Sequence, residues 1–340
     1  MTHFHRTTST ALRASRVLAT MVFAGTLMAA GGSIASADPT GPANPAQEVK
    51  THEISESKAD AAIAHWTPER MAAAKNADEL VEGKDFSGEA VEKGAPQRIK
   101  GTDAVPAIAQ KAKKDKGDKD LKATAEQPVE HIGKVFFTLG GSDYVCSGNS
   151  VVSENGSTVS TAGHCVNEGP GTWATNWVFV PAYENGNAPY GAFAAEELFA
   201  PTEWSEQGDM TYDTAFARVT GENGEKLADV VGASGVAFNE DTGLDYTAYG
   251  YPAAAPFDGE TLQSCHGTAQ QDPTGDTESQ GISCDMTGGS SGGPWFIGEG
   301  SEGLQNSVNS FGYTAIPDVM WGPSWGSVIE GSYEMAQGSN

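Results

Sequence analysis

A serine lies in a glycine-rich segment that could turn several backbone N–H groups toward one point. The segment runs Gly288-Gly-Ser-Ser-Gly-Gly-Pro294, and glycines on both sides of Ser291 permit backbone conformations that other residues rarely adopt. Convergent N–H groups are what an oxyanion hole requires. A serine hydroxyl is a poor nucleophile without a neighbouring base, so the segment alone is equally compatible with a flexible loop.

The base must come from one of three histidines after residue 130, namely His131, His164 and His266. His164 lies in Ser160-Thr-Ala-Gly-His-Cys165, at the end of an expected β run and beside a cysteine that would fix the backbone. His131 and His266 fit structural or surface roles better, although His266 also adjoins a cysteine and stays the alternative base. We therefore expect His164 to activate Ser291.

A carboxylate is needed to hold the imidazole tautomer and to stabilise the imidazolium. Asp213 opens the apolar run Tyr212-Asp-Thr-Ala-Phe-Ala-Arg-Val219, and an acid that leads into a buried strand can point inward. Asp209, four residues earlier, is the alternative. We favour Asp213.

The chain order of these residues excludes two other hydrolase classes. Gly289-Ser-Ser-Gly-Gly293 also fits the G-x-S-x-G pattern of α/β-hydrolases, but that class places its histidine after the serine, and no histidine follows His266. Subtilisin-like order needs an aspartate before His164, and Asp143 has such a position. The sequence lacks the alternating strands and helices of that fold.

The start of the chain has the features of a signal peptide, predicted over residues 1–37. A basic n-region precedes an apolar stretch, Val17 to Ala30, and Ala35-Ser-Ala37 offers a small-residue cleavage site before Asp38. A membrane anchor is the weaker alternative, because the apolar stretch is short for a bilayer span. We expect secretion and no membrane association.

Residues 38–130 differ in composition from the rest and are predicted to be a propeptide or linker, partly disordered. They contain no cysteine, and residues 111–120 form a dense charge run. A helix is expected near Thr67, with Thr67 as its cap and Pro68 in its first turn. A disordered spacer that stays in the mature protein is the alternative.

Residues 131–340 have the pattern of a β protein. Short β-rich runs alternate with Gly, Asn and Ser turns, and Glu154-Asn-Gly156 is a hairpin signal. Such regular short strands favour an all-β barrel or sandwich. The expected strands are 134–139, 150–153, 158–161, 177–180, 214–219, 246–249 and 308–311.

The cysteines and the charge restrict the compartment and the partners. Cys146, Cys165, Cys265 and Cys284 form an even set behind an export signal, which implies disulfides. Of the three possible pairings we favour the sequence-local one, Cys146 with Cys165 and Cys265 with Cys284; no zinc-like spacing is present. From residue 131 onward there are 3 basic and 27 acidic residues, so nucleic-acid binding is not expected.

Three motifs together resemble those of the chymotrypsin-like (trypsin-like) serine peptidases. They are Thr161-Ala-Gly-His-Cys165, Asp213-Thr-Ala-Phe216 and Gly289-Ser-Ser-Gly-Gly-Pro294, in the order of that family. The resemblance covers roughly residues 131–335 and is to the secreted bacterial branch, which includes the glutamyl endopeptidases. It implies an all-β fold of two six-stranded antiparallel barrels, here about 131–225 and 226–340.

The resemblance also assigns roles. It makes His164, Asp213 and Ser291 a catalytic triad, with the N–H groups of Gly289 and Ser291 lining the oxyanion hole. Animal trypsin-like enzymes carry an aspartate before the nucleophile that pairs with the new N-terminus. This chain has Ser290 there, so a pro-segment would act otherwise, as a folding aid or a steric blocker.

Specificity is less constrained by the sequence. Asp285 lies six residues before Ser291, the offset of the acid in a trypsin pocket, and Ser310 lies in an expected pocket-wall strand. However, Asp285-Met-Thr-Gly-Gly289 also resembles glutamyl endopeptidases, so the offset need not be structurally equivalent. The scarcity of Lys and Arg after residue 130 would limit self-cleavage by a basic-specific enzyme, and we favour that specificity over acidic or apolar ones.

The sequence therefore predicts a secreted, monomeric serine endopeptidase that acts on proteins or peptides without a cofactor or metal. An inactive binding or adhesion module on the same fold and an esterase are the alternatives.

Overall fold

The computed structural model describes residues 49–81, 84, 90–103 and 122–339. The expected signal peptide and the charge run at 111–120 lie outside the described residues. Across the described ranges, no helix combines the length and apolar character that crossing a membrane requires.

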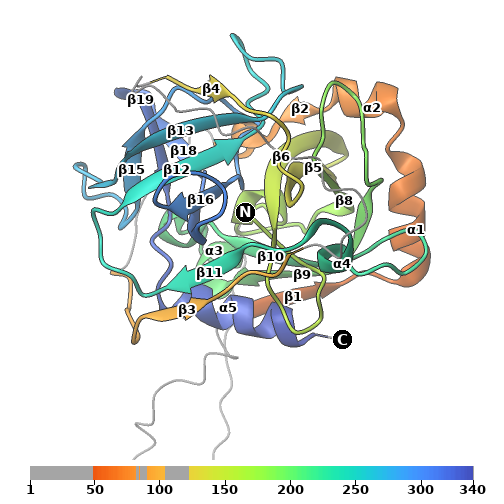
Figure 1. The fold of residues 1–340 in the computed structure, drawn as a ribbon, viewed down its shortest axis with the longest axis horizontal. Coiled ribbons are helices and arrows are strands. Elements are labelled where there is room, and N and C mark those ends of the chain that lie inside the picture. Colours follow the sequence, from red (N-terminus) through yellow and green to blue (C-terminus); the bar gives the residue numbers. More distant parts are fainter. Residues whose placement is uncertain (1–48, 82–83, 85–89, 104–121, 340) are drawn as a thin grey trace, which may run out of the picture. The chain divides into compact units, whose positions relative to one another are not determined.

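Six antiparallel strands form a closed barrel in the first half of the predicted peptidase part. Their order is β9-β10-β7-β6-β5-β8, and β8 pairs with β9 to close the ring (Figure 1). Their bounds are Ile132–Leu139 (β5), Ser142–Val151 (β6), Thr158–Thr161 (β7), Thr175–Pro181 (β8), Phe193–Pro201 (β9) and Ala215–Thr220 (β10).

Both faces of β5 are buried because they pack into different cores. Val135 and Phe137 belong to the core inside the barrel, whereas Ile132 and Phe136 belong to a second core that contains Trp66. Alternate residues of a strand point to opposite faces, so an apolar strand without polar alternation indicates cover on both sides. Here that outer cover comes from the N-terminal segment around Trp66 and from the second half around Tyr249 and Phe296.

The second half consists of two sheets, so the expected second closed six-stranded barrel is not observed. The larger sheet has the order β3-β11-β17-β16-β12-β13-β4 and the smaller β14-β15-β19-β18. Between β13 and β15 the link is the Cys265–Cys284 disulfide and packed side chains in place of a hydrogen-bonded ladder. The bounds are Gln97–Ile99 (β3), Thr124–Ala125 (β4), Gly235–Phe238 (β11), Asp245–Gly250 (β12), Gln263–Thr268 (β13), Gln270–Gln271 (β14), Gln280–Ser283 (β15), Pro294–Ile297 (β16), Leu304–Val308 (β17), Phe311–Tyr313 (β18) and Ile316–Gly322 (β19).

Helices connect and cover these sheets. The C-terminal helix α5 places Tyr333 against Phe216 of the first barrel and Phe238 of the second half, with ring centroids 5.8 and 5.2 Å apart, so it joins the two halves. The bounds are Glu56–His65 (α1), Pro68–Ala73 (α2), Thr202–Ser205 (α3), Leu227–Val231 (α4), Ser327–Gly338 (α5), and the 3-10 turns Ala77–Leu80 (η2), Gly163–Cys165 (η3) and Met210–Tyr212 (η4).

The N-terminal segment, residues 49–103, adds strands to the sheets of the peptidase part. β1 (Val49–Glu53) pairs antiparallel with β9, and β3 pairs antiparallel with β11. The short β2 (Lys75–Asn76) pairs in parallel with β6. The helix expected near Thr67 is α2, whose cap Thr67 accepts a hydrogen bond from the Arg70 amide.

One turn prediction is confirmed and one strand prediction is wrong. β6 and β7 form the hairpin expected around Glu154-Asn-Gly156. The expected strand at 308–311 is wrong, because residues 309 and 310 separate β17 from β18. The side chains of these two residues make hydrogen bonds that are not part of a β ladder. Asn309 Nδ2 donates to the carbonyls of Tyr249 and Ser290, and the Ser310 hydroxyl donates to a carboxylate described below.

Lys134 is buried in β5, 2% exposed, with its Nζ 3.7 Å from Glu260 Oε1 and 4.2 Å from the centre of the Tyr183 ring. Desolvation lowers the pKa of Lys134 to about 8, although Glu260 opposes the shift. A buried ammonium is retained here by its carboxylate and aromatic partners.

This lysine should make stability rise with pH. The unfolded chain keeps the proton up to its ordinary pKa of 10.5 whereas the folded chain loses it near 8, so unfolding takes up a proton between these values. We expect Lys134 to contribute on the order of 3 kcal/mol more at pH 10.5 than at pH 8. Urea unfolding of wild type and Lys134→Met, both carrying Ser291→Ala, would measure it; a pH-independent difference between them would contradict the prediction.

Candidate active site

His164 and Asp213 are joined by a buried, two-point contact. His164 lies in η3 directly after β7, and Asp213 follows η4 and precedes β10; both side chains are 0% exposed. His164 Nδ1 is 2.7 Å from Asp213 Oδ2, and the His164 amide donates to Oδ1 at 2.8 Å. One carboxylate thus fixes the ring and its backbone together. The geometry suits an Nδ1–H tautomer that leaves Nε2 as the basic nitrogen.

The surroundings of Asp213 favour its charged form. Burial raises its pKa, but the His164 charge and hydrogen bonds from His164 and Ser310 outweigh it, so the pKa of Asp213 lies below its usual range. The Ser310 hydroxyl donates to Asp213 Oδ2 at 2.5 Å. Ser310 therefore contacts the carboxylate of Asp213, and the pocket-wall role expected for it stays a prediction.

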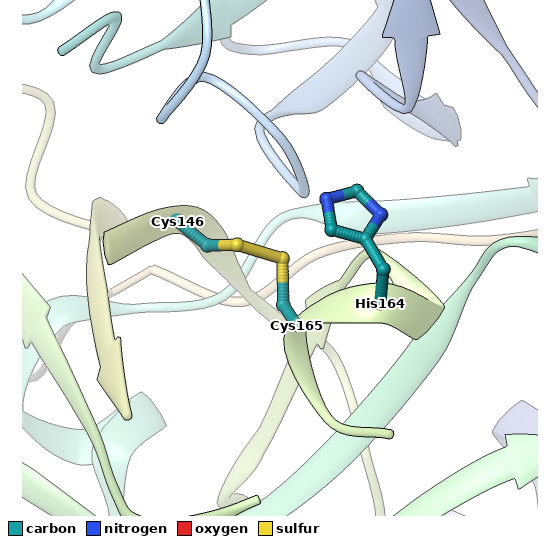
Figure 2. A group of neighbouring side chains, drawn as sticks. All are labelled: Cys146, His164 and Cys165. Carbon is teal, nitrogen blue, oxygen red and sulfur yellow. A yellow bond between two sulfur atoms is a disulfide. The ribbon is translucent and has the colours of Figure 1, made fainter. Parts of the chain in front are cut away.

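A disulfide holds η3 against β6. Cys146 and Cys165 are bonded beside the His164 ring, as Figure 2 shows, and the favoured sequence-local pairing is present for both bridges. Ligand atoms of Cys146, His164 and Cys165 lie within 4.8 Å of one another. A metal would need thiolates, and these two sulfurs are committed to each other.

The Ser291 segment is a tightly packed turn between β15 and β16. Gly289 and Gly292 have φ of 97° and 82°, a region that other residues avoid. A Cβ on Gly292 would lie 2.2 Å from Thr161 Oγ1 and 2.4 Å from the Ser147 carbonyl. The Ser291 carbonyl accepts from the Ser147 amide at 2.7 Å. The flexible-loop alternative therefore does not describe this segment.

A carboxylate from the N-terminal segment occupies this turn. Asp78, in η2, accepts a hydrogen bond from Ser291 Oγ on its Oδ1 at 2.9 Å, and its carboxylate also accepts one from the Gly289 amide. Burial raises the pKa of Asp78, while the His164 charge and these bonds partly oppose the shift. His164 Nε2 is buried and has no hydrogen-bond partner among the described residues.

A second contact of the N-terminal segment lies beside the histidine. The Lys84 ammonium lies 4.7 Å from the centre of the Trp204 ring and donates to the carbonyl of Gly169 at 2.7 Å and to that of Glu168. Trp204 in turn packs edge-on to His164, with ring centroids 6.4 Å apart. The described residues 75–81 and 84 therefore include contacts with β6, with Ser291 and with Trp204.

The alternative triad members lie in other environments. Asp209 caps η4 by accepting from the Thr211 amide at 2.9 Å. His131 Nδ1 is 2.8 Å from Asn149 Oδ1, and the exposed His266 contacts Thr247. Asp143 accepts from Arg70 and contacts His65, both in the N-terminal segment.

Asp285 is separated from the histidine and serine contacts. Its Oδ1 accepts a hydrogen bond from the Ala123 amide at 2.6 Å, next to the Cys265–Cys284 bridge. The sequence-based role of Asp285 as the free anion of a specificity pocket therefore has no support from its contacts.

The residue that sequence reasoning missed is Asp78. It lies in Asn76-Ala-Asp-Glu-Leu80, a short polar segment without glycine, cysteine or a recognisable motif. Its position follows from a contact across 213 residues of sequence. The only available signal was the expectation that a propeptide or linker, residues 38–130, precedes the peptidase part.

Comparisons with known proteins agree with this fold. No protein-family model matches the chain. The solved structure of the protease Anisep from Arthrobacter nicotinovorans is 62% identical, with all of that chain and 64% of this one covered at a TM-score of 0.63. A thermostable serine protease, AL20, from an extremophilic microorganism is 53% identical over 98% of its chain and 62% of this one, at a TM-score of 0.60.

More distant matches show less about this chain. A Glu endopeptidase structure is 18% identical at a TM-score of 0.50, covering 97% of its chain and 64% of this one, and shows the shared fold. An extracellular metalloprotease of Bacillus subtilis is 28% identical over 116 residues, and the chain spans 36% of its length.

The chain belongs to the bacterial chymotrypsin-like serine proteases. Like the two similar proteases of that family, it is a serine endopeptidase, a hydrolase whose substrates are proteins or peptides.

Proposed function

We propose that Ser291, His164 and Asp213 are the catalytic triad of this peptidase. The single observation that carries the assignment is the buried contact of Asp213 with both the ring and the amide of His164, at 2.7 and 2.8 Å. A carboxylate in that position orients the ring and stabilises the imidazolium formed during catalysis. The tightly packed Ser291 turn supplies a fixed nucleophile.

The reaction follows from these groups. His164 Nε2 takes the Ser291 proton while Oγ forms a bond to the substrate carbonyl carbon, and the developing oxyanion accepts hydrogen bonds from the amides of Gly289 and Ser291. His164 then returns the proton to the leaving amine as the peptide bond breaks, which leaves an acyl-enzyme. Water, deprotonated by the same nitrogen, releases the acid product and restores Ser291.

The N-terminal segment, residues 49–103, acts in this proposal as an inhibitory propeptide. Asp78 accepts hydrogen bonds from Ser291 Oγ and the Gly289 amide, two groups that catalysis requires. While it is docked, the nucleophile faces a carboxylate in place of His164 Nε2. Removal of the segment would activate the enzyme.

Export is the remaining part of the proposal. The n-region, apolar stretch and cleavage site within residues 1–37 indicate a secreted precursor, and two disulfides suit an oxidising compartment. The similar proteins include one named as extracellular.

A fluorophosphonate probe tests the triad. The processed protein should be labelled on one serine, and peptide mapping should locate the label on Ser291. Labelling should vanish in Ser291→Ala and His164→Ala and persist in Ser290→Ala, the matched control next to the nucleophile. An unlabelled Ser291 in the processed wild-type protein would exclude this triad.

A further inference from the structure

The amide of Ala123 is bonded to a carboxylate at the point where the chain enters the peptidase part. Ala123 N–H donates to Asp285 Oδ1 at 2.6 Å, and the Ala123 side chain packs against the cluster that contains Cys265, Cys284 and Met286. Lys122, directly before it, is exposed. The contact therefore joins a half-buried alanine to a half-buried acid, with an accessible basic residue on the N-terminal side.

The strand that follows holds Ala123 in place. β4 (Thr124–Ala125) pairs with β13 at Ser264 and Gln263 (Figure 1), and the Glu126 amide donates to the Leu262 carbonyl at 2.9 Å. The peptidase sheet thus extends to residue 124, seven residues before the expected start at 131. Cutting the chain before Ala123 would leave this ladder intact.

Asp285 has no cation near it in the described residues. None of the ion pairs within 4.0 Å among the described residues includes Asp285, and its hydrogen bond comes from a neutral amide. A positive charge on the donor would add direct Coulomb attraction to a hydrogen bond in which only the carboxylate is charged. The site is thus built for a donor at the Ala123 nitrogen and would bind more tightly if that nitrogen were positive.

We propose that an endopeptidase specific for basic residues hydrolyses the Lys122–Ala123 bond, and that the new Ala123 ammonium forms an ion pair with Asp285. Water supplies the hydroxyl of the new Lys122 carboxyl group and a proton to the leaving amine, which takes a second proton from solvent and becomes the ammonium. The inference rests on the proposed role of residues 49–103 as a propeptide.

The ion pair would act on the oxyanion hole. Asp285 is followed by Thr287, whose hydroxyl donates to the Ala254 carbonyl at 2.7 Å, and by Gly288, whose carbonyl accepts from Ala253 at 2.6 Å. Gly289 comes next and supplies an oxyanion amide. A charged anchor at Asp285 would fix the start of this short loop. Asp285 is then a positioning residue and not the anion of a pocket for basic side chains.

The first test is the N-terminus of the secreted, active protein. Intact mass and N-terminal sequencing should give a chain that begins at Ala123. A chain that begins at any other residue would overturn the proposal, because the Ala123 nitrogen would then be absent or still part of a peptide bond.

The second test separates the ammonium from other roles of Asp285. In the full-length chain, Asp285→Asn is combined with a glycine inserted between residues 122 and 123, so that the mature chain starts one residue early. In the mature chain that begins at Ala123, Asp285→Asn should lower kcat/KM per titrated active site about tenfold. In the mature chain that begins at the inserted glycine, the same substitution should change kcat/KM less than twofold. Equal losses in both backgrounds would refute the ion pair.

Two further measurements keep the test independent of activity and folding yield. In Ser291→Ala protein, Asp285→Asn should lower the unfolding temperature of the cleaved form by several degrees more than that of the uncleaved form, because only the cleaved form has the ammonium. Asp241→Asn, an exposed acid, should change neither. Fluorophosphonate labelling of Ser291 reports the proposed triad separately, so a failed ion pair and a failed triad give different results.

Discussion

Ser291→Ala is expected to lower kcat/KM of the processed enzyme on a peptide substrate by roughly 10⁴-fold or more, because no other group at the site can form the acyl-enzyme. His164→Ala should have a loss of similar size, and the double variant should lose no more than either single one, since the two groups act as a unit. Initial rates on a chromogenic peptide, normalised to folded protein, would measure both.

The control for this series is Asp209→Asn. Asp209 is the neighbouring acid that was the alternative to Asp213 and that caps η4. Its replacement should change kcat/KM by less than about tenfold, whereas Asp213→Asn should lose roughly 10⁴-fold because the imidazole tautomer is no longer held. Similar losses for the two acids would contradict the assignment of Asp213.

Asp78→Ala is expected to unmask the nucleophile in the uncleaved precursor. The substitution removes the acceptor that binds Ser291 Oγ and the Gly289 amide, so both groups become available. The rate at which a fluorophosphonate labels the full-length band should rise at least tenfold, since a hydrogen bond to a charged group contributes roughly 1.5–3 kcal/mol. Gel separation distinguishes this band from processed enzyme.

Glu79→Gln is the matched control for Asp78. Glu79 lies in the same turn η2 and pairs on the surface with Lys75 at 3.5 Å, so its loss should leave labelling within about twofold. Equal labelling rates for wild type and Asp78→Ala would show that other contacts, such as those of Lys84, block the site instead.

The pH dependence of latency follows from the buried carboxyl. Burial raises the pKa of Asp78 above the ordinary 3.8, so docking takes up a proton between the two values, and the docked state weakens as pH rises through the raised pKa. The labelling rate of the wild-type precursor should therefore rise relative to that of Asp78→Asn, which mimics the neutral carboxyl and has no proton to lose there, as the pH increases. A constant ratio of the two rates would contradict this.

The parts of the site carried by local motifs could be predicted from the sequence. His164 and Ser291 lie in short segments whose glycines and cysteine define their own backbone, and the closed barrel follows from regular strands and a hairpin. The second half differed from the closed barrel that was expected. The strands beside Cys265 and Cys284 meet there through a disulfide and packed side chains, which the pattern of strands in the sequence does not encode.

Asp285 and Asp78 show the limit of sequence offsets. Six residues before Ser291 is a position along the chain, but the contact of Asp285 is decided by where β4 brings Ala123. Asp78 acquires its role only when the N-terminal segment packs on the barrel, a long-range event driven by apolar burial around Trp66 and β5. Neither contact has a local signature.

The Asp78–Ser291 contact also determines how inhibition would end. Attack on a carboxylate expels no amine, so the docked turn cannot be consumed as a substrate would be. While the segment is part of the same chain, its effective concentration at the site is fixed and independent of how much protein is present. Once the connection is cut, binding becomes bimolecular and obeys mass action. Dilution of the cleaved segment after secretion would then complete activation. A high local concentration of the segment and the enzyme would delay it.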